Sequence, residues 1–262
     1  MNRYSSILTP EDSDRLNARK SFSRFNGKCP TCDDTGDFVY NGRIHECEKD
    51  FDGVCIQKKL FMRYELANIP YRYQRFDWDE FDTQPEARCE IGKYISNLQN
   101  SIKTGTGIYI HSNGLGTGKT LIACHILKEA IKQGYKAYFC QFFDLVNISD
   151  DKASRNVLEK QLVNCDIICI DDVVSSKISE KQSDFFRYML EKVIRDRVHN
   201  AMPIIMTSNL NSEQLLKEYD RVFSLLVSSC YTIELDSSFD YRIDAMRQKL
   251  SGDFQQNIAP IS

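Results

Sequence analysis

The sequence has little of what marks a membrane, secreted or disordered protein. Its 262 residues include only 12 Gly and 6 Pro, too few for long disordered stretches. No apolar run reaches the ~18 residues that a membrane span needs. The first twenty residues also lack the apolar stretch of a signal peptide. These absences predict a soluble, cytoplasmic protein with no membrane partner.

The sequence also lacks a strong charge of either sign. The net charge is -3, with 42% hydrophobic and 27% charged residues, which is ordinary globular composition. A strongly basic nucleic-acid coat is therefore excluded, and any contact with DNA must be local.

Cysteine, by contrast, is abundant. Six of the ten cysteines are scattered, several of them in apolar runs, and in a cytosolic chain they are expected to be reduced and buried. The other four lie close together, at Cys29, Cys32, Cys47 and Cys55.

The cysteine-rich segment has too few apolar residues to form a stable core alone, so it needs a cross-link such as a bound metal ion. Four thiolates suit a tetrahedral structural Zn²⁺, and we predict that Cys29, Cys32, Cys47 and Cys55 bind one. His45 is close enough in sequence to replace one of them. Two alternatives stay open, namely a redox dithiol at Cys29 and Cys32, which lacks a βαβ context, and free cysteines in a loop.

From about residue 88 apolar strands alternate with helices. Alternation at this spacing predicts an α/β fold with a mostly parallel sheet covered on both faces. The strands are expected at 107–112, 136–142, 166–171, 203–209 and 230–235. Helices are expected at 56–70, 87–103, 120–134, 153–165, 180–200 and 211–220, with others starting near Thr9 and near Asp240.

These patterns divide the chain into a small zinc-binding domain and a larger α/β domain. The predicted parts are a zinc-binding N-terminal module (1–65), an aromatic connector without regular structure (66–87), the α/β domain (88–250) and a tail (251–262).

A glycine loop, "SNGLGTGKT" at 112–120, comes close to the phosphate-binding pattern G-x-x-x-x-G-K-[ST]. It follows a predicted strand and opens a predicted helix, which disfavours a chance glycine-rich turn. Backbone N–H groups would wrap the phosphates, Lys119 would reach the β- and γ-phosphates, and the Thr120 hydroxyl would bind Mg²⁺. The predicted nucleotide-binding residues are Asn113, Gly114, Gly116, Thr117, Gly118, Lys119 and Thr120.

Asn113 stands where the pattern has glycine. Asparagine is the residue other than glycine that best tolerates left-handed backbone geometry. We therefore expect Asn113 to adopt that geometry in a working loop.

Two acidic residues end the strand "DIICIDD". Asp171 is predicted to hold the water shell of Mg²⁺, and Asp172 to orient or deprotonate the attacking water. Taken alone, such a pair could be a helix cap or loop. Asn209, at the tip of the next strand, "IIMTSN", is predicted to bind the γ-phosphate or the same water.

The ordered motifs "LANIPYRY", "GTGKT", "ICIDDV", "IIMTSN", "DRVFSLL" and "DYR" resemble the AAA+ ATPases of the DnaC/DnaI helicase-loader and IstB transposition-helper group. The resemblance covers about residues 60 to 250. It implies a five-stranded parallel sheet, ATP as the nucleotide, Asn209 as sensor 1 and Arg242 as the sensor 2 arginine.

One position departs from that group. The group's pattern R-V-x-S-R-L has a second arginine that reaches a neighbouring subunit's ATP, and here that position is Leu225. Arg221 is the candidate substitute, and a solvated helix arginine is the alternative. The departure predicts weak hydrolysis that a partner or DNA stimulates.

The resemblance implies an ATP-dependent loader of a hexameric replicative helicase onto single-stranded DNA. The zinc module would contact the helicase, and ATP would switch the assembly, with nucleotide-dependent self-assembly allowed. Two alternatives remain, a transposition helper that binds duplex DNA and an adaptor that hardly hydrolyses ATP. Residues 191–200, "EKVIRDRVHN", are expected to form a solvated helix face, or else a contact with single-stranded DNA.

Overall fold

The computed structural model describes residues 27–76, 78, 85–147, 158, 160–174, 180–237 and 240. Within these, residues up to 78 and Ile131–Gly134 form one compact unit, and the others form a second. The chain passes from the first unit to the second between Asp82 and Thr83. The helices expected near Thr9 and after Asp240, the tail at 251–262 and Arg242 lie outside the described residues.

The first unit begins with a hairpin that the motif analysis did not predict. Strands β1 (Asp37–Tyr40) and β2 (Arg43–Glu46) pair antiparallel around Asn41 and Gly42. Both turn residues have positive φ, 50° and 70°. An Asn-Gly pair with this geometry is the preferred two-residue hairpin turn, so the sequence did carry the signal.

Two helices complete the first unit, α2 (Ile56–Leu66) and α3 (Tyr71–Gln74). The rings of Phe61 and Tyr71 pack edge to face with their centroids 6.1 Å apart. Gln74 is buried and donates hydrogen bonds to Glu65 Oε1 (2.9 Å) and to the backbone oxygen of Ile69 (2.8 Å). The start of the predicted connector is therefore regular and packed.

The second unit is built on a sheet of five parallel strands in the order β4-β5-β6-β3-β7, which confirms the predicted fold class. The strands are β3 (Gly107–His111), β4 (Ala137–Gln141), β5 (Ile167–Val173), β6 (Ile204–Ser208) and β7 (Cys230–Glu234). β5 runs beyond its predicted end and includes both acidic residues.

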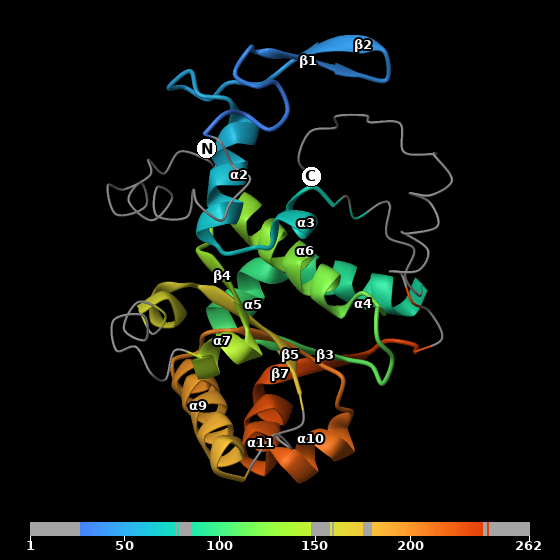
Figure 1. Ribbon diagram of the computed structural model, residues 1–262, viewed down its shortest axis with the longest axis vertical. Helices are drawn as coiled ribbons and strands as arrows, with labels where there is room; N and C mark the ends of the chain where they lie inside the picture. Colours follow the sequence, from blue (N-terminus) through green and yellow to red (C-terminus); the bar gives the residue numbers. More distant parts are fainter. Residues whose placement is uncertain are drawn as a thin grey trace. The chain divides into compact units, whose positions relative to one another are not determined.

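Helices cover both faces of this sheet (Figure 1). One face packs against α7, α9, α10 and α11. The core between them includes every second residue of the strands, for example Ile204 and Met206 in β6. The opposite face carries α4 and α6. The helix bounds are α4 (Pro85–Ser96), α5 (Leu98–Thr104), α6 (Lys119–Lys132), α7 (Phe142–Asn147), α9 (Glu180–His199), α10 (Ser212–Glu218) and α11 (Asp220–Ser229).

Several helices differ from the predicted ones. The segment expected as one helix at 87–103 is two, α4 and α5, and α7 and α11 were not predicted. Of the helix expected at 153–165, the structure describes residues 158 and 160–165, and all of these except 165 are helical. No helix in the described part of the chain is both long and apolar enough to cross a membrane.

Arg197 of α9 is buried, so the helix face expected to be solvated is in part a structural anchor. Its guanidinium donates to the backbone oxygens of Leu162, Cys165, Asp166 and Pro203, at 2.5 to 3.2 Å. Burial lowers the pKa of Arg197 to about 10. Because these carbonyls precede β5 and β6, one side chain ties together the starts of both strands.

We expect Arg197→Lys to lower the free energy of unfolding by about 1–3 kcal/mol, because an ammonium cannot satisfy all four carbonyls and buried acceptors lose their partners. Urea denaturation measures the loss. The matched control is Arg195→Lys, which alters a partly exposed ion pair with Glu191 on the same helix. That control is expected to change stability by less than about 0.5 kcal/mol. Equal losses in both variants would contradict the anchoring role.

Candidate nucleotide and zinc sites

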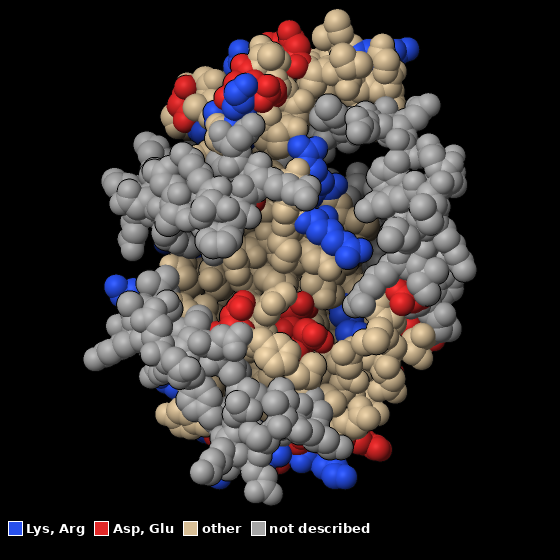
Figure 2. Space-filling model, viewed as in Figure 1, with Lys and Arg blue, Asp and Glu red and all other residues tan. Residues whose placement is uncertain are grey.

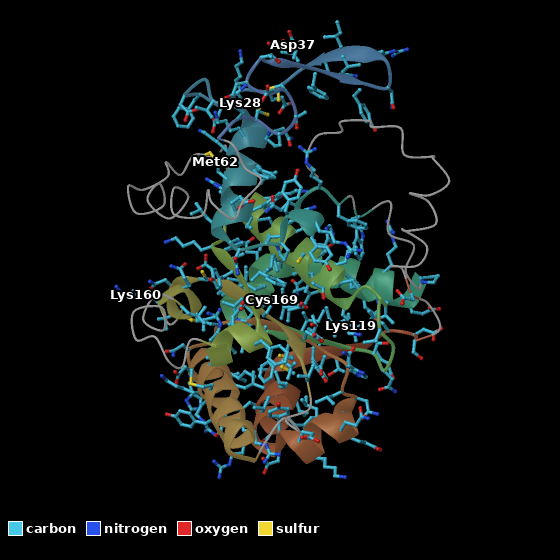
Figure 3. The ribbon with its side chains drawn as sticks, in the orientation of Figure 1. Lys28, Asp37, Met62, Lys119, Lys160 and Cys169 are labelled. Atoms are coloured by element: carbon cyan, nitrogen blue, oxygen red, sulfur yellow. The ribbon has the colours of Figure 1, made fainter. Side chains whose placement is uncertain are left out.

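The glycine loop occupies the turn between the end of β3 and the start of α6, as predicted (Figure 3). Lys119 is buried, and its Nζ donates to the backbone oxygens of Ser112 (3.4 Å) and Gly114 (2.9 Å) and to Thr117 Oγ1 (3.2 Å). The ammonium is thus held inside the curve of the loop. A loop of this shape at a helix N-terminus suits the phosphates of a nucleotide.

Glycine is required within the loop for two different physical reasons. Gly116 and Gly118 have φ of +71° and +93°, which L side chains rarely adopt. Gly114 instead has an ordinary φ, but a Cβ there would lie 2.9 Å from Cα of Ser237. A Cβ on Gly116 would also collide with the Asp240 carboxylate. The segment that follows β7 thus lies against the loop.

The interpretation of Asn113 was wrong. Asn113 is not among the described residues with positive φ, so it does not adopt left-handed geometry. Its side chain is exposed, and the position therefore has room for many side chains. The constraint on this part of the loop falls on the next residue, Gly114, through its contact with Ser237.

Asp171 lies at the centre of the candidate Mg²⁺ site. Its carboxylate is buried and accepts hydrogen bonds from Thr120 Oγ1 (3.1 Å) and Thr207 Oγ1 (2.6 Å). Burial raises the pKa of Asp171, while those two hydrogen bonds oppose the rise. A carboxylate beside a hydroxyl fits Mg²⁺, which takes one or two protein oxygens and keeps several waters.

The strand carrying these acids is irregular at this point. Ile170 pairs with Met206 and Val173 pairs with Ser208, so two residues of β5 oppose Thr207 alone. This is a β-bulge, and its second residue, Asp172, has φ of +59°. The backbone N–H of Asp172 donates to Thr207 Oγ1 (2.9 Å).

The bulge aims Asp172 at the tip of β6. The exposed Asp172 carboxylate accepts a hydrogen bond from Asn209 Nδ2 (3.3 Å). The other amide atom of Asn209, Oδ1, is buried without a protein hydrogen-bond partner. The structure therefore brings Thr120, Asp171, Asp172 and Asn209 together in the arrangement that the motifs predicted, with roles that remain predictions.

Thr207 is the residue of this site that the motif analysis missed. It lies inside "MTSN", two residues before Asn209, which is at the tip of the strand. A hydroxyl in an otherwise apolar strand, two residues before the tip, was the available signal.

The two candidate arginines are placed differently. Arg221 lies at the start of α11, is 72% exposed, and its guanidinium is 3.7 Å from the Glu191 carboxylate on α9. Arg242 lies outside the described residues. Leu225, where the resemblance places a finger arginine, is partly buried and packs against the core.

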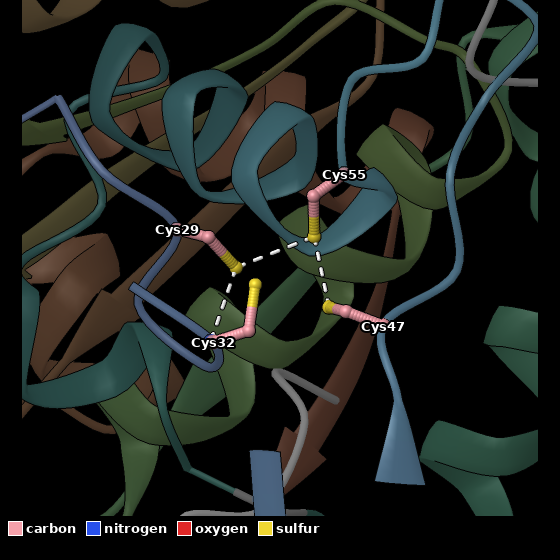
Figure 4. Close-up of side chains that lie close together, drawn as sticks. All are labelled: Cys29, Cys32, Cys47 and Cys55. Atoms are coloured by element: carbon pink, nitrogen blue, oxygen red, sulfur yellow. Dashed lines mark hydrogen bonds between the residues drawn. The ribbon is translucent and has the colours of Figure 1, made fainter. Parts of the chain in front are cut away.

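The four clustered cysteines converge in the first unit (Figure 4). All four are buried, and their Sγ atoms lie within 4.8 Å of one another. Cys55 Sγ is 3.3 Å from Cys29 Sγ and 2.9 Å from Cys47 Sγ, and all four are free thiols. Tetrahedral Zn²⁺ with Zn–S bonds of ~2.3 Å holds its sulfurs about 3.8 Å apart, so the group fits this ion.

His45 is not part of this group. Its exposed ring stacks on Phe38, with the centroids 5.5 Å apart, on the β1–β2 hairpin. Phe38 in turn packs against the cysteine cluster. The arrangement favours Cys55 over His45 as the fourth zinc ligand.

We predict about one Zn²⁺ per chain, because four buried thiols converge where the apolar core is small. Elemental analysis of the purified protein measures it. Cys32→Ser should lose the metal, whereas Cys89→Ser, which removes an exposed thiol outside the cluster, and His45→Ala should both keep it. Full zinc content in Cys32→Ser would rule out this ligand set.

The corrected geometry of the loop makes a second prediction. Asn113→Val should keep ATP affinity within about threefold, because a β-branched residue fits an ordinary φ. Gly114→Ala should weaken binding, because its Cβ meets Ser237. Titration with a fluorescent ATP analogue compares the two variants. A strong loss in Asn113→Val would show that its side chain serves the nucleotide.

A family model described as "IstB-like ATP binding protein" matches residues 54–224. The match contains the glycine loop, both acids, Asn209 and Arg221. It begins after three of the four clustered cysteines.

Individual relatives match a smaller part of the chain. A protein from Geobacillus stearothermophilus, named as an ATP-binding protein of insertion sequence IS5376, is 31% identical over 148 residues, covering 55% of this chain and 56% of that protein. An IS21-like counterpart from Bacteroides fragilis (strain YCH46) is 39% identical over 152 residues, covering 50% and 72%. The chain thus spans little more than half the length of the first relative.

Solved structures resemble the fold. The DnaC helicase loader has a TM-score of 0.53 at 21% identity, over 63% of this chain and 99% of that chain. DnaI has a TM-score of 0.53 at 18% identity, over 63% and 94%. At such identities the likeness shows the fold alone. The family match over most of the chain, together with the loop and strand-tip acids, makes this protein a member of the IstB-like ATP-binding proteins, with an AAA+ P-loop fold.

Proposed function

We propose that this protein is an ATP-dependent loader that places a hexameric replicative helicase on single-stranded DNA. The observation that carries the proposal is the four-cysteine module ahead of the ATPase. Three of its cysteines precede the region that the family model matches, so the module adds something to the shared ATP-binding part. A separate module suits a protein that holds a partner while its nucleotide state changes.

ATP binding and hydrolysis would act as the switch. The loop amides and Lys119 bind the phosphates, and Thr120 and Asp171 are placed to hold Mg²⁺. Bound Mg²⁺ neutralises charge on the β- and γ-phosphates. Asp172 is the exposed acidic residue, and it orients the attacking water. Asn209 donates a hydrogen bond to the Asp172 carboxylate. A residue that acts on water affects turnover more than nucleotide affinity.

Hydrolysis by the isolated chain is proposed to be weak. Leu225 stands where the resemblance places a finger arginine, and this partly buried leucine has no charged group to offer a neighbour's phosphates. A partner protein or DNA would then raise the rate of ATP hydrolysis.

Contact with single-stranded DNA is proposed to be local. Figure 2 shows described side chains of both charges on the face that it draws. The net charge of -3 does not make a large positive field around the protein. This balance of charge disfavours a protein that grips duplex DNA along its length.

The second candidate is a transposition helper. It is favoured by the two relatives named for insertion sequences, at 31% and 39% identity. Its partner would be a transposase and its substrate duplex DNA.

Lys119→Ala and Asp172→Asn should separate nucleotide binding from switching. Lys119→Ala should lose ATP affinity, because its ammonium lies where phosphate charge is bound. Asp172→Asn should bind ATP but turn it over about 100-fold more slowly, as for loss of a general base. Lys93→Ala, on the exposed surface of α4, is the matched control. ATP affinity and turnover are measured on the same preparations.

The same variants test the loader function. With the host's hexameric helicase and a single-stranded DNA circle, helicase deposition should fail with Lys119→Ala and stall with Asp172→Asn. Both variants should still bind the helicase, because the cysteine module is unchanged. Deposition by Lys119→Ala at the unmodified rate would reject the ATP switch. ATPase stimulation by duplex DNA and transposase, with no helicase binding, would favour the transposition helper.

A further inference from the structure

Thr207 faces both acidic residues across the bulge in β5. The register leaves it as the one residue of β6 opposite Asp171 and Asp172. Its hydroxyl donates to Asp171 Oδ1 at 2.6 Å and accepts from the Asp172 backbone N–H at 2.9 Å. Thr120 hydrogen-bonds to Asp171 and Asn209 hydrogen-bonds to Asp172, whereas Thr207 hydrogen-bonds to both acidic residues.

The direction of these two hydrogen bonds is set by chemistry. A hydroxyl has a single proton, and a carboxylate oxygen can only accept, so the proton points to Asp171. The hydroxyl lone pairs then face the amide of Asp172. One Oγ1 atom thus holds the orientation of one acid and the backbone of the next.

Burial makes this arrangement difficult to replace. Thr207 is 1% exposed, so water cannot take over either hydrogen bond when the hydroxyl is removed. The backbone of Asp172 also needs support, because φ of +59° is unfavourable for a side-chain-bearing residue.

Strand packing alone does not explain a threonine at this position. Ile205, two residues earlier on the same face of β6, is fully buried and apolar. Valine has the same shape as threonine and the same preference for strands. What threonine adds over valine at this position is therefore its two hydrogen bonds to Asp171 and Asp172.

We propose that Thr207 is a positioning residue for the ATP site, which orients Asp171 toward Mg²⁺ and holds Asp172 in its left-handed conformation. It acts through the two acids and does not touch the nucleotide. This inference rests on the proposed ATP site, and it assigns a role to a residue outside the predicted set.

The first test measures nucleotide binding without turnover. ATP affinity in excess EDTA depends on the loop and Lys119, so Thr207→Val should leave it within about threefold. The Mg²⁺ concentration that gives half of the Mg²⁺-dependent gain in affinity should rise about 10–100-fold, the usual effect of losing a partner of a metal ligand. Thr207→Ser, which keeps the hydroxyl, should stay near the unmodified protein.

The second test measures steady-state turnover at saturating Mg²⁺. For Thr207→Val, kcat should fall about 10–100-fold while KM for ATP changes by less than about threefold. Ile205→Val is the matched control, because it removes one buried methyl group from the same strand face without contacting either acid. Thermal unfolding of all three variants records their stability.

The outcomes separate the two proposals. The positioning role is rejected if Thr207→Ser loses as much as Thr207→Val, or if Ile205→Val shows the same kcat loss as Thr207→Val. It is also rejected if Thr207→Val keeps the Mg²⁺ response of the unmodified chain. If the unmodified chain binds no ATP, the proposed function fails first and this role falls with it. If the unmodified chain binds ATP, and Thr207→Val has the same Mg²⁺ response and kcat as that chain, only the role of Thr207 is rejected and the proposed function stands.

Discussion

The candidate site depends on the bulge in β5, where Asp171 and Asp172 both lie opposite a single residue of β6, Thr207. In a regular strand, consecutive side chains point to opposite faces of the sheet, so two adjacent acidic side chains would diverge. The bulge adds a residue and turns Asp172 into left-handed geometry, and its carboxylate then meets Asn209. Asp171 stays on the face of Thr120. One irregularity therefore gives two neighbouring carboxylates different tasks.

A bulge is useful only if the strands on both sides keep their register, and two polar side chains hold that register at opposite ends. Arg197 binds the carbonyls of Asp166 and Pro203, each directly before a strand. Thr207, near the far end of β6, binds the two acidic residues near the far end of β5. Between them the β5 and β6 residues Ile168, Ile170, Ile204 and Met206 are buried in one core. Apolar packing supplies most of the stability, whereas the polar contacts specify the alignment.

Sequence patterns predicted the five strands and the arrangement of Thr120, Asp171, Asp172 and Asn209, because parallel strands bring their carboxyl ends to one edge. They did not predict what depends on contacts distant in sequence. The left-handed geometry expected of Asn113 was wrong. The steric constraint lies on Gly114 instead and comes from Ser237, more than a hundred residues away. The charge of Arg197 favoured a surface position, because its four carbonyl partners cannot be identified from the sequence. The hairpin at Asn41 was missed although its turn residues indicated it.

Leu225 and Arg221 of α11 offer different chemistry to a neighbouring chain. Leu225 is partly buried and packs against the core, so it offers only an apolar side chain. Arg221, one helical turn earlier, is 72% exposed and paired with Glu191, which also pairs with Arg195. An exposed pair of this kind contributes about 0–1 kcal/mol, so exchanging Glu191 for a phosphate of a neighbouring chain costs little. Glu191 would keep Arg195 after the exchange, and no buried charge would be left unpaired. We propose that in an ATP-bound assembly Arg221 exchanges Glu191 for a neighbour's phosphate, while Arg195 keeps the Glu191 carboxylate neutralised.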